Sequence, residues 1–369
     1  MSGSPPSPRP PTPISSRYRI LRKLGTGSVG TVFLALDETA ARRVALKVLR
    51  VDRLGVEAVA SLQEEFRSIA GLSHPQIARA YDFGYTDENR LPFFTREYIE
   101  GRPLAPGPPP PSGEVTPASF LRPILDLLDA LHYLHAHEIL HLDIHAGNLI
   151  VADREDRGGV LIDLGFRRLV QESPRVIPWQ PSLPPEFAAG GEPTAASDLY
   201  LVGALLLYRL TGDANTAPRF PREFPGWGTR RTLELERIVS KAVQGSPERR
   251  FPTAADFKKA LTEALGDSGC AAPAVVEPGE VTVGRDAELA RIEELLRGAL
   301  EGTSSALYFT GPPGVGKSRL LTEARLRAQL RGLRVIEARF VKEAAGGPSL
   351  REAFHGGEPR GETTPPWLQ

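Results

Sequence analysis

The chain has 369 residues, with 45 Lys plus Arg balanced by 45 Asp plus Glu, and 41% of its residues are hydrophobic. This length fits two domains better than one, and the charge balance excludes an overall field that would attract nucleic acid or an acidic membrane surface. Cys270 is the single cysteine, which excludes an internal disulfide and makes a reducing cytoplasm the expected compartment.

No membrane partner is expected either. The longest apolar run, residues 199–208, covers about half the length that a membrane-spanning helix needs. Residues 2–13 do not have the pattern of a signal peptide. We therefore expect a cytoplasmic protein whose partners are neither nucleic acid nor membrane.

Strands are expected soon after the start of the chain. Residues 1–16 are rich in proline and poor in apolar side chains, which predicts a disordered leader. Alternating apolar and polar residues then predict strands at 18–21, 31–35 and 43–49. Residues 25–30 read GTGSVG, a G-x-G-x-x-G pattern with a strand on both sides. That context argues against a dinucleotide fingerprint, which leads into a helix, and favours a hairpin whose backbone amides cover phosphates.

Two helices and a further strand are expected next. Residues 58–72 have a helical period, and residues 93–99 predict a strand. A second helix is expected to start at Thr116-Pro117 and to run to His137. No Cys or carboxylate cluster accompanies the histidines of this helix, which we interpret as ordinary surface residues: His132, His135 and His137.

A short loop carries the strongest chemical signal in the chain. Residues 141–148 read HLDIHAGN, and an apolar run follows them directly. Asp143 can orient a hydroxyl and accept its proton, while Asn148 offers an oxygen to Mg²⁺. Asp163 follows a second apolar run, at the end of another expected strand. This spacing places Asn148 and Asp163 on neighbouring hairpin strands, where one cation can bridge them.

A second module is predicted beyond the linker at residues 266–280. A helix is expected over 283–300, a strand over 306–310 and another helix over 319–330. The strand and the last helix flank GPPGVGKS at 311–318, a G-x-x-x-x-G-K-S loop whose amides can form an anion nest. Lys317 can reach the β- and γ-phosphates, and the Ser318 hydroxyl can bind Mg²⁺. The expected nucleotide-binding residues of this loop are Gly311, Gly314, Gly316, Lys317 and Ser318.

Hydrolysis by the second module is not expected. Residues 333–341 can form one further strand, but no apolar run ending in Asp-Glu follows Ser318 that could provide a second Mg²⁺ ligand. We therefore expect a truncated module over 281–343 that binds nucleotide, followed by an irregular tail over 344–369.

In their order along the chain, these motifs resemble those of the protein-kinase superfamily. The glycine loop, the strand Val44-Ala45-Leu46-Lys47, the HLDIHAGN loop and Asp163-Leu164-Gly165 match its phosphate-binding and metal-binding motifs. Pro184-Pro185-Glu186, the segment 197–203 and Arg250 resemble features of eukaryotic-like protein kinases. The resemblance implies a buried acid, Asp198, beneath the loop and a buried pair between Glu186 and Arg250.

The second module resembles AAA/STAND-type ATPases, as in bacterial kinases that are fused to a signalling ATPase. The implied fold is an α+β bilobal kinase domain over 17–265, with a small antiparallel β lobe over 17–100 and a helical lobe over 101–265. A partial α/β P-loop NTPase fragment follows it. The implied activity is transfer of the γ-phosphate of MgATP to protein serine or threonine hydroxyls in a bacterial signalling role. Regulatory partners are expected to act through the ATPase module.

The resemblance also assigns roles to individual residues. Asp143 is the expected catalytic base, and Lys47 with Glu65 positions the phosphates, with Glu64 as the alternative to Glu65. His145 stands where the family has a lysine that steadies the transferred phosphate. The implied metal ligands are Asn148 and Asp163. The implied ATP-binding residues are Leu24, Gly25, Gly27, Gly30, Val32, Ala45, Lys47, Glu97 and Ile99.

The sequence departs from the family pattern at four positions, and the loss of the lysine and the threonine near the γ-phosphate predicts low activity. Leu142 replaces an arginine that pairs with a phosphorylated activation segment, so that switch is not expected. His145 replaces the lysine, and Arg96 stands at the back of the nucleotide pocket, where the family has an uncharged residue. Trp179 falls where protein Ser/Thr kinases have a threonine. Two alternatives follow. One is a pseudokinase scaffold that binds nucleotide. The other is a small-molecule kinase, because the sequence D-I-H-x-G-N also resembles the catalytic loop of such kinases.

Overall fold

A computed structural model describes residues 17–27, 30–49, 63, 66, 69–88, 90–109, 115–154, 156–163, 183–213, 220–266, 284–333 and 335. The expected leader, tail and most of the linker lie outside the described residues, as do Glu64, Glu65 and Trp179. Among the described helices, none has the length and apolar character that crossing a bilayer requires.

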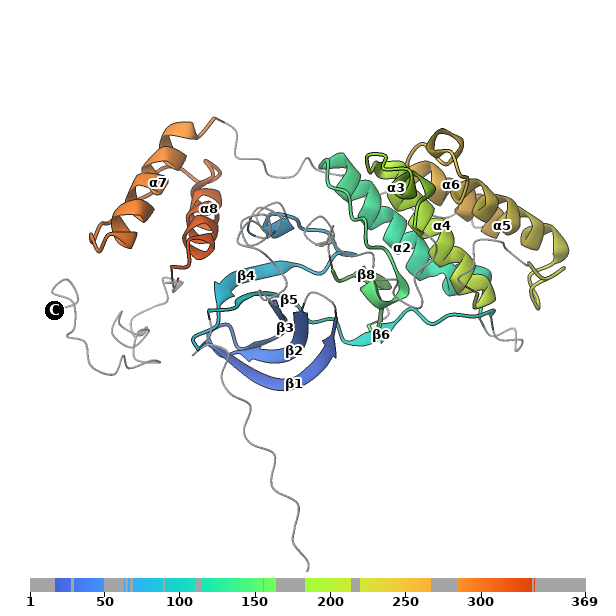
Figure 1. The fold of residues 1–369 in the computed structure, drawn as a ribbon, viewed down its shortest axis with the longest axis horizontal. Coiled ribbons are helices and arrows are strands. Elements are labelled where there is room, and N and C mark those ends of the chain that lie inside the picture. Colours follow the sequence, from blue (N-terminus) through green and yellow to red (C-terminus); the bar gives the residue numbers. More distant parts are fainter. Residues whose placement is uncertain are drawn as a thin grey trace, which may run out of the picture.

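The first lobe is a five-stranded antiparallel sheet in the order β1-β2-β3-β5-β4 (Figure 1). Its strands are β1 (Tyr18–Thr26), β2 (Gly30–Asp37), β3 (Arg42–Leu49), β4 (Ala80–Tyr85) and β5 (Pro92–Glu97). Apolar side chains at alternating positions of these strands are buried on one face of the sheet. Burial of that face specifies the register in which the strands pair. The predicted small β lobe is confirmed.

A second, three-stranded sheet holds the end of the HLDIHAGN loop. It consists of β6 (Gly101–Pro103), β7 (Leu149–Ala152) and β8 (Gly159–Leu161), in that order. β7 and β8 are antiparallel, with Leu149 opposite Leu161. Asn148 directly precedes β7 and Asp163 follows β8, so the hairpin places both residues at the same end. This is the arrangement that the sequence predicted.

The second lobe is helical. It contains α2 (Pro117–Ala136), α3 (Pro185–Ala188), α4 (Ala195–Thr211), α5 (Thr229–Ala242) and α6 (Ala254–Leu265). α2 begins where predicted, because the Thr116 side chain accepts a hydrogen bond from the Ser119 N–H at 3.1 Å. α2 packs against α4, α6 and β8, and its leucines form the centre of the lobe's core. The predicted helical lobe is therefore confirmed.

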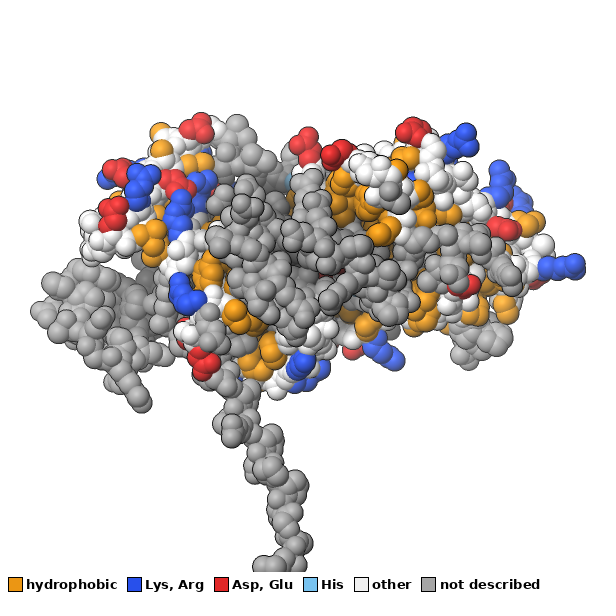
Figure 2. Space-filling view, in the orientation of Figure 1, with side chains coloured by type: hydrophobic (Ala, Val, Ile, Leu, Met, Phe, Trp, Pro, Cys, Tyr) orange, Lys and Arg blue, Asp and Glu red, His pale blue; other side chains and the backbone are white. Residues whose placement is uncertain are grey.

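The second module contributes α7 (Asp286–Leu300) and α8 (Lys317–Leu330), which confirms both predicted helices. The predicted strand at 306–310 is wrong: these residues are not part of a strand, and Tyr308 is 84% exposed. A strand needs a ladder partner for its backbone groups, and the expected partner at 333–341 lies almost wholly outside the described residues. Charges of both signs are interspersed over α7 and α8 (Figure 2), as in the Arg327–Glu293 and Arg285–Glu288 pairs.

α8 packs against the small lobe beside β4 (Figure 1). Gln329 Nε2 donates to Asp82 Oδ1 at 2.6 Å, and Arg325 Nη1 donates to the same oxygen at 3.1 Å. The other oxygen of Asp82 accepts from Tyr18 Oη at 2.9 Å and from Arg17 at 3.0 Å. One buried carboxylate of β4 therefore joins α8 to the start of β1.

This contact predicts that α8 loses stability when Gln329 is replaced. Gln329→Ala removes a buried hydrogen bond to a charged group, worth about 1.5–3 kcal/mol. Hydrogen exchange measured on the full chain should show faster exchange of α8 amides, with α5 amides unaffected. Gln244→Ala removes a hydrogen bond to the Ser240 carbonyl at the end of α5 and is the matched control. Unchanged protection of α8 in Gln329→Ala would rule out the contact.

Candidate active site

Asp198 of α4 holds the HLDIHAGN loop in place. Its buried carboxylate accepts hydrogen bonds from the backbone N–H groups of His141 at 2.9 Å and Leu142 at 2.7 Å. Leu142 has a φ of +58°, a left-handed conformation that is unfavourable for a branched side chain and needs such support. The expectation of an acid buried beneath the loop is thus met.

His135 shares this carboxylate. Its Nε2 lies 2.8 Å from Asp198 Oδ2, and its side chain is 13% exposed. Sequence reasoning treated His135 as an ordinary surface histidine, which is wrong. Its partner comes from α4, 63 residues further along the chain, so spacing within α2 contained no signal of the contact.

Asn148 is oriented by Asp143. Its Nδ2 donates to the Asp143 carbonyl at 3.0 Å and to Asp143 Oδ2 at 3.2 Å. Because the amide nitrogen donates both of these hydrogen bonds, Oδ1 is the atom of Asn148 that could bind a cation. His145 Nε2 lies 3.7 Å from Asp143 Oδ2. The loop therefore brings three of the predicted site residues to one place, and Asp143 is the most exposed of them.

Asp163 lies between two cations. Lys47 Nζ donates to Asp163 Oδ2 at 2.6 Å, and Arg96 Nη1 lies 3.3 Å from Asp163 Oδ1. Burial alone would raise the pKa of Asp163, but the charges of Lys47 and Arg96 outweigh it, and the pKa falls to about 2. Glu65, the partner that the sequence predicted for Lys47, lies outside the described residues. The contact of Arg96 with Asp163 was not predicted, although an arginine at the back of the expected nucleotide pocket had marked this position as a departure from the family pattern.

The glycine loop joins β1 to β2 in the small lobe. Gly27 N–H donates to the Gly30 carbonyl at 2.9 Å and closes the turn. A Cβ on Gly30 would lie 2.2 Å from the Val48 carbonyl oxygen, so only glycine fits this close approach. Gly25 pairs with Val32, and Leu24 is 38% exposed at the start of the turn.

One face of the small sheet carries the other predicted ATP-binding side chains. Val32 lies opposite Lys47 across β2 and β3, and Ala45 lies two residues before Lys47 on β3. Residues two apart on a strand lie on the same face of the sheet. Val32, Ala45 and Lys47 therefore lie on one face. Arg96 lies opposite Ala45 on β5 and belongs to the same face.

Glu97 ends β5 and leads to Ile99. Its carboxylate forms a bidentate pair with Arg157, with one contact at 2.8 Å, and Arg157 lies in the turn between β7 and β8. This pair ties the segment between the lobes to the hairpin that carries Asn148 and Asp163. The roles of Glu97 and Ile99 toward adenine stay predictions.

Mg²⁺ fits the residues of this site. Asp163 Oδ1 is buried and has no hydrogen-bond partner among the described residues, and Asn148 Oδ1 is a second hard oxygen donor. Mg²⁺ is usually held by one or two protein oxygens together with phosphates and water. No group of three or more His, Cys, Asp or Glu residues suited to a metal occurs among the described residues. The donors therefore suit an ion that arrives with a nucleotide.

Glu186 and Arg250 form the expected ion pair. Arg250 Nη1 and Nη2 donate to the two oxygens of Glu186 at 2.8 and 2.7 Å, and the Arg250 side chain is fully buried. Arg250 also donates to the carbonyls of Ala196 and Gln244 at 2.9 Å, and Ser197 Oγ donates to Glu186 at 2.7 Å. The pair fixes α3, which follows the segment 164–182, to the helical lobe.

The loop that the sequence predicted as a second nucleotide site precedes and begins α8. Gly311, Gly314 and Gly316 all have positive φ angles, which bring their backbone into the tight loop. Lys317 Nζ donates to the Gly311 and Pro312 carbonyls at 2.8 Å, so the ammonium lies across its own loop. Ser318 follows in the first turn of α8. The predicted residues of this loop are therefore brought together.

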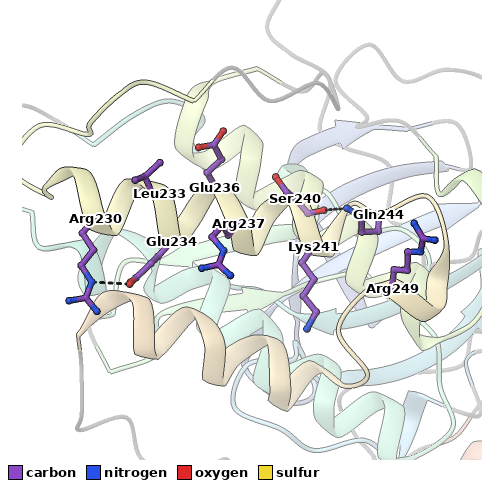
Figure 3. Close-up of a pocket in the computed structure, with 9 residues that line it drawn as sticks. All are labelled: Arg230, Leu233, Glu234, Glu236, Arg237, Ser240, Lys241, Gln244 and Arg249. Atoms are coloured by element: carbon purple, nitrogen blue, oxygen red, sulfur yellow. Dashed lines mark hydrogen bonds and ion pairs between the residues drawn. The ribbon is translucent and has the colours of Figure 1, made fainter.

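A depression also lies along α5 in the helical lobe, and no residue of either loop lines it (Figure 3). Long charged side chains line it, and Arg230 pairs with Glu234 across one turn of the helix at 3.1 Å. These residues carry charges of both signs and belong mostly to the solvated face of an amphipathic helix. Because none of the predicted site residues lines it, we assign it no part in the chemistry.

Comparisons with known proteins agree with this geometry. A family model described as a protein kinase domain matches residues 18–223, and one described as an AAA ATPase domain matches residues 281–357. The serine/threonine-protein kinase PknB of Mycolicibacterium smegmatis is 31% identical over 294 residues, or 74% of this chain and 47% of that protein. PrkC of Bacillus subtilis, also a serine/threonine-protein kinase, is 31% identical over 68% of this chain and 41% of its own length.

A solved structure shares the fold. The kinase domain of PknI from Mycobacterium tuberculosis aligns with a TM-score of 0.54 at 24% identity, over 70% of this chain and all of that one. The chain spans about half the length of the curated relatives it matches. By the family match and by these relatives, the chain belongs to the protein kinase family, and an AAA ATPase domain follows its kinase domain.

Proposed function

We propose that the protein is a serine/threonine protein kinase of bacterial signalling that transfers the γ-phosphate of ATP to protein hydroxyls and uses Mg²⁺. The observation that carries the proposal is the convergence of Asp143, Asn148, Asp163 and Lys47 at one end of the β7–β8 hairpin. The names of the relatives, which are serine/threonine-protein kinases, support the class of acceptor. The single cysteine supports a cytoplasmic location.

In this proposal each residue has a distinct task. Asp143 orients the acceptor hydroxyl and takes its proton while the oxygen bonds to the γ-phosphorus and ADP leaves. Lys47 holds the α- and β-phosphates, and the glycine loop between β1 and β2 covers them. Asn148 and Asp163 would hold Mg²⁺, which neutralises charge on the phosphate oxygens. His145 can donate one hydrogen bond to the transferred phosphate but is a weaker partner than a lysine.

The acceptor class is tested by phosphorylation with labelled ATP, the full chain and a generic basic protein, followed by mass-spectrometric mapping. We expect phosphoserine or phosphothreonine, formed only when Mg²⁺ is present, and turnover at or below about 1 s⁻¹, the low end for kinases. Labelling of an aminoglycoside or another metabolite, with none on protein, would instead establish a small-molecule kinase. The buried Glu186–Arg250 pair, a feature of protein kinases, favours the protein acceptor.

A nucleotide-binding scaffold without transfer activity is the second candidate. The observation that favours it is the contact of Arg96 with Asp163, which places a fixed cation at a proposed metal ligand. A scaffold would bind ATP but label no protein at any Mg²⁺ concentration. Labelling of protein that requires Asp143 would exclude it.

For the ATPase module we propose nucleotide binding through Lys317 and Ser318 without hydrolysis, and regulatory partners that act through this module. Lys317→Ala removes a charged partner of the phosphates and should weaken binding at this loop by about 10-fold or more. Titration calorimetry with ADP on the full chain should then find one nucleotide per chain where the unaltered protein binds two. ATP hydrolysis that is lost in Lys317→Ala and kept in Asp143→Asn would show that the module hydrolyses ATP after all.

A further inference from the structure

Arg96 is a buried charge in a place that otherwise takes apolar side chains. It lies on β5, and its side chain is 8% exposed. Its neighbours along the strand include Phe93 and Phe94, which are buried in the small lobe. A guanidinium removed from water is costly unless an anion balances it. The anion that Arg96 approaches is the carboxylate of Asp163.

The two cations hold Asp163 in different ways. Lys47 Nζ makes a short hydrogen bond of 2.6 Å to Oδ2. Arg96 Nη1 is 3.3 Å from Oδ1, and neither atom has a hydrogen bond to a described residue, although both are buried. The Arg96 contact is therefore a charge contact without the geometry of a hydrogen bond. Oδ1 keeps lone pairs that a metal ion could use once the guanidinium moves.

The charge of Arg96 bears directly on a metal ion at Asp163. The guanidinium lies 3.3 Å from Oδ1, so a divalent cation that approaches this oxygen meets a positive charge that is already in place. A positive charge within a few ångströms repels a second cation, just as it lowers the pKa of a neighbouring acid. An uncharged residue at position 96 would remove this repulsion.

We propose that Arg96 is a positioning residue that competes with Mg²⁺ for Oδ1 of Asp163. In the protein without nucleotide, the guanidinium holds the carboxylate in place of the ion. Binding of the metal with ATP requires Arg96 to give up Oδ1, so this kinase needs more divalent metal than one with an uncharged residue at this position. The inference rests on the proposed function, in which Asp163 is a metal ligand.

The test measures metal affinity rather than turnover. Mn²⁺ is titrated into the full chain saturated with a non-hydrolysable ATP analogue, and free Mn²⁺ is followed by electron paramagnetic resonance. All proteins carry Lys317→Ala together with Ser318→Ala, which removes the proposed phosphate and metal contacts of the second nucleotide loop. Arg96→Met is expected to tighten Mn²⁺ binding about 10-fold, the effect of one neighbouring charge. Arg96→Lys keeps the positive charge and is expected to tighten Mn²⁺ binding less than Arg96→Met does.

Arg42→Met is the matched control. Arg42 also pairs with a buried acid of the small lobe, Asp37, at 3.8 Å, but it is the first residue of β3, five positions before Lys47. Its Mn²⁺ affinity should equal that of the parent protein. Equal or weaker Mn²⁺ binding in Arg96→Met would overturn the proposal, provided that the variant still binds the analogue without metal. If Arg96→Met does not fold, Arg96→Gln gives the same comparison.

Asp163→Asn separates this inference from the function on which it rests. Weaker Mn²⁺ binding in Asp163→Asn, with no change in Arg96→Met, would refute the role of Arg96 alone. Unchanged Mn²⁺ binding in Asp163→Asn would show that Asp163 is not a metal ligand, and both the inference and that part of the proposed function would fall.

Discussion

Asp143→Asn is expected to lower phosphoryl transfer to protein by at least about 100-fold, the usual contribution of a positioned base. The amide keeps the shape of the side chain but cannot accept a proton from the acceptor hydroxyl. The loop should keep its structure, because Asp198 holds it through the backbone of His141 and Leu142. Initial rates with labelled ATP measure the effect.

Two comparisons make this result specific. ATP affinity should stay within about 3-fold of the unaltered protein, because Asp143 is proposed to contact the hydroxyl and not the nucleotide. Asp156→Asn alters an exposed acid in the turn of the β7–β8 hairpin and should leave the rate unchanged. A transfer rate in Asp143→Asn equal to that of Asp156→Asn would remove Asp143 from the mechanism.

Glu186→Ala is expected to lower the free energy of unfolding of the helical lobe by about 3–5 kcal/mol, since it leaves the buried Arg250 charge without its partner. Urea unfolding of the full chain, followed by circular dichroism, measures the shift. Glu248→Ala, at an exposed acid beside Arg250 in sequence, should leave the midpoint unchanged. Replacing both partners, as Glu186→Leu with Arg250→Met, should recover part of the loss, because no unpaired charge then remains. Equal midpoints for Glu186→Ala and Glu248→Ala would show that the pair contributes nothing.

The same pair gives a pH dependence with a definite sign. Burial would raise the pKa of Glu186, but hydrogen bonds from Arg250 and Ser197 outweigh it, and the pKa in the folded protein is below 4.5. An acid with a lowered folded pKa stabilises the protein above its unfolded pKa, and this stability is lost as the pH falls through the folded value. The difference in stability between the unaltered protein and Glu186→Gln should therefore be constant near neutral pH and shrink below about pH 4.5.

Much of the fold and the site could be predicted because local patterns determine them. The G-x-G-x-x-G turn, the cap at Thr116 and the glycines before Lys317 depend on residues a few positions apart. The hairpin that brings Asn148 and Asp163 together follows from two apolar runs and a short turn. These features are present in the structure where the sequence placed them.

The remaining features depend on contacts between distant segments. The partner of His135 is 63 residues away, and the partner of Arg96 is Asp163, on a different sheet. The docking of α8 on β4 joins residues more than 240 positions apart, and no spacing rule connects them. The prediction of a strand at 306–310 was wrong because an apolar run forms a strand only beside a partner strand, which the local sequence does not reveal.

The central claim is that Asp143, Asn148 and Asp163 surround one metal–nucleotide site, and a crystal of the full chain grown with Mn²⁺ and a non-hydrolysable ATP analogue tests it most directly. We predict an anomalous Mn²⁺ peak between Asn148 Oδ1 and the Asp163 carboxylate, with the γ-phosphate directed toward Asp143. Mn²⁺ and analogue found only at Ser318, with Asp163 still held by Lys47 and Arg96, would contradict the account.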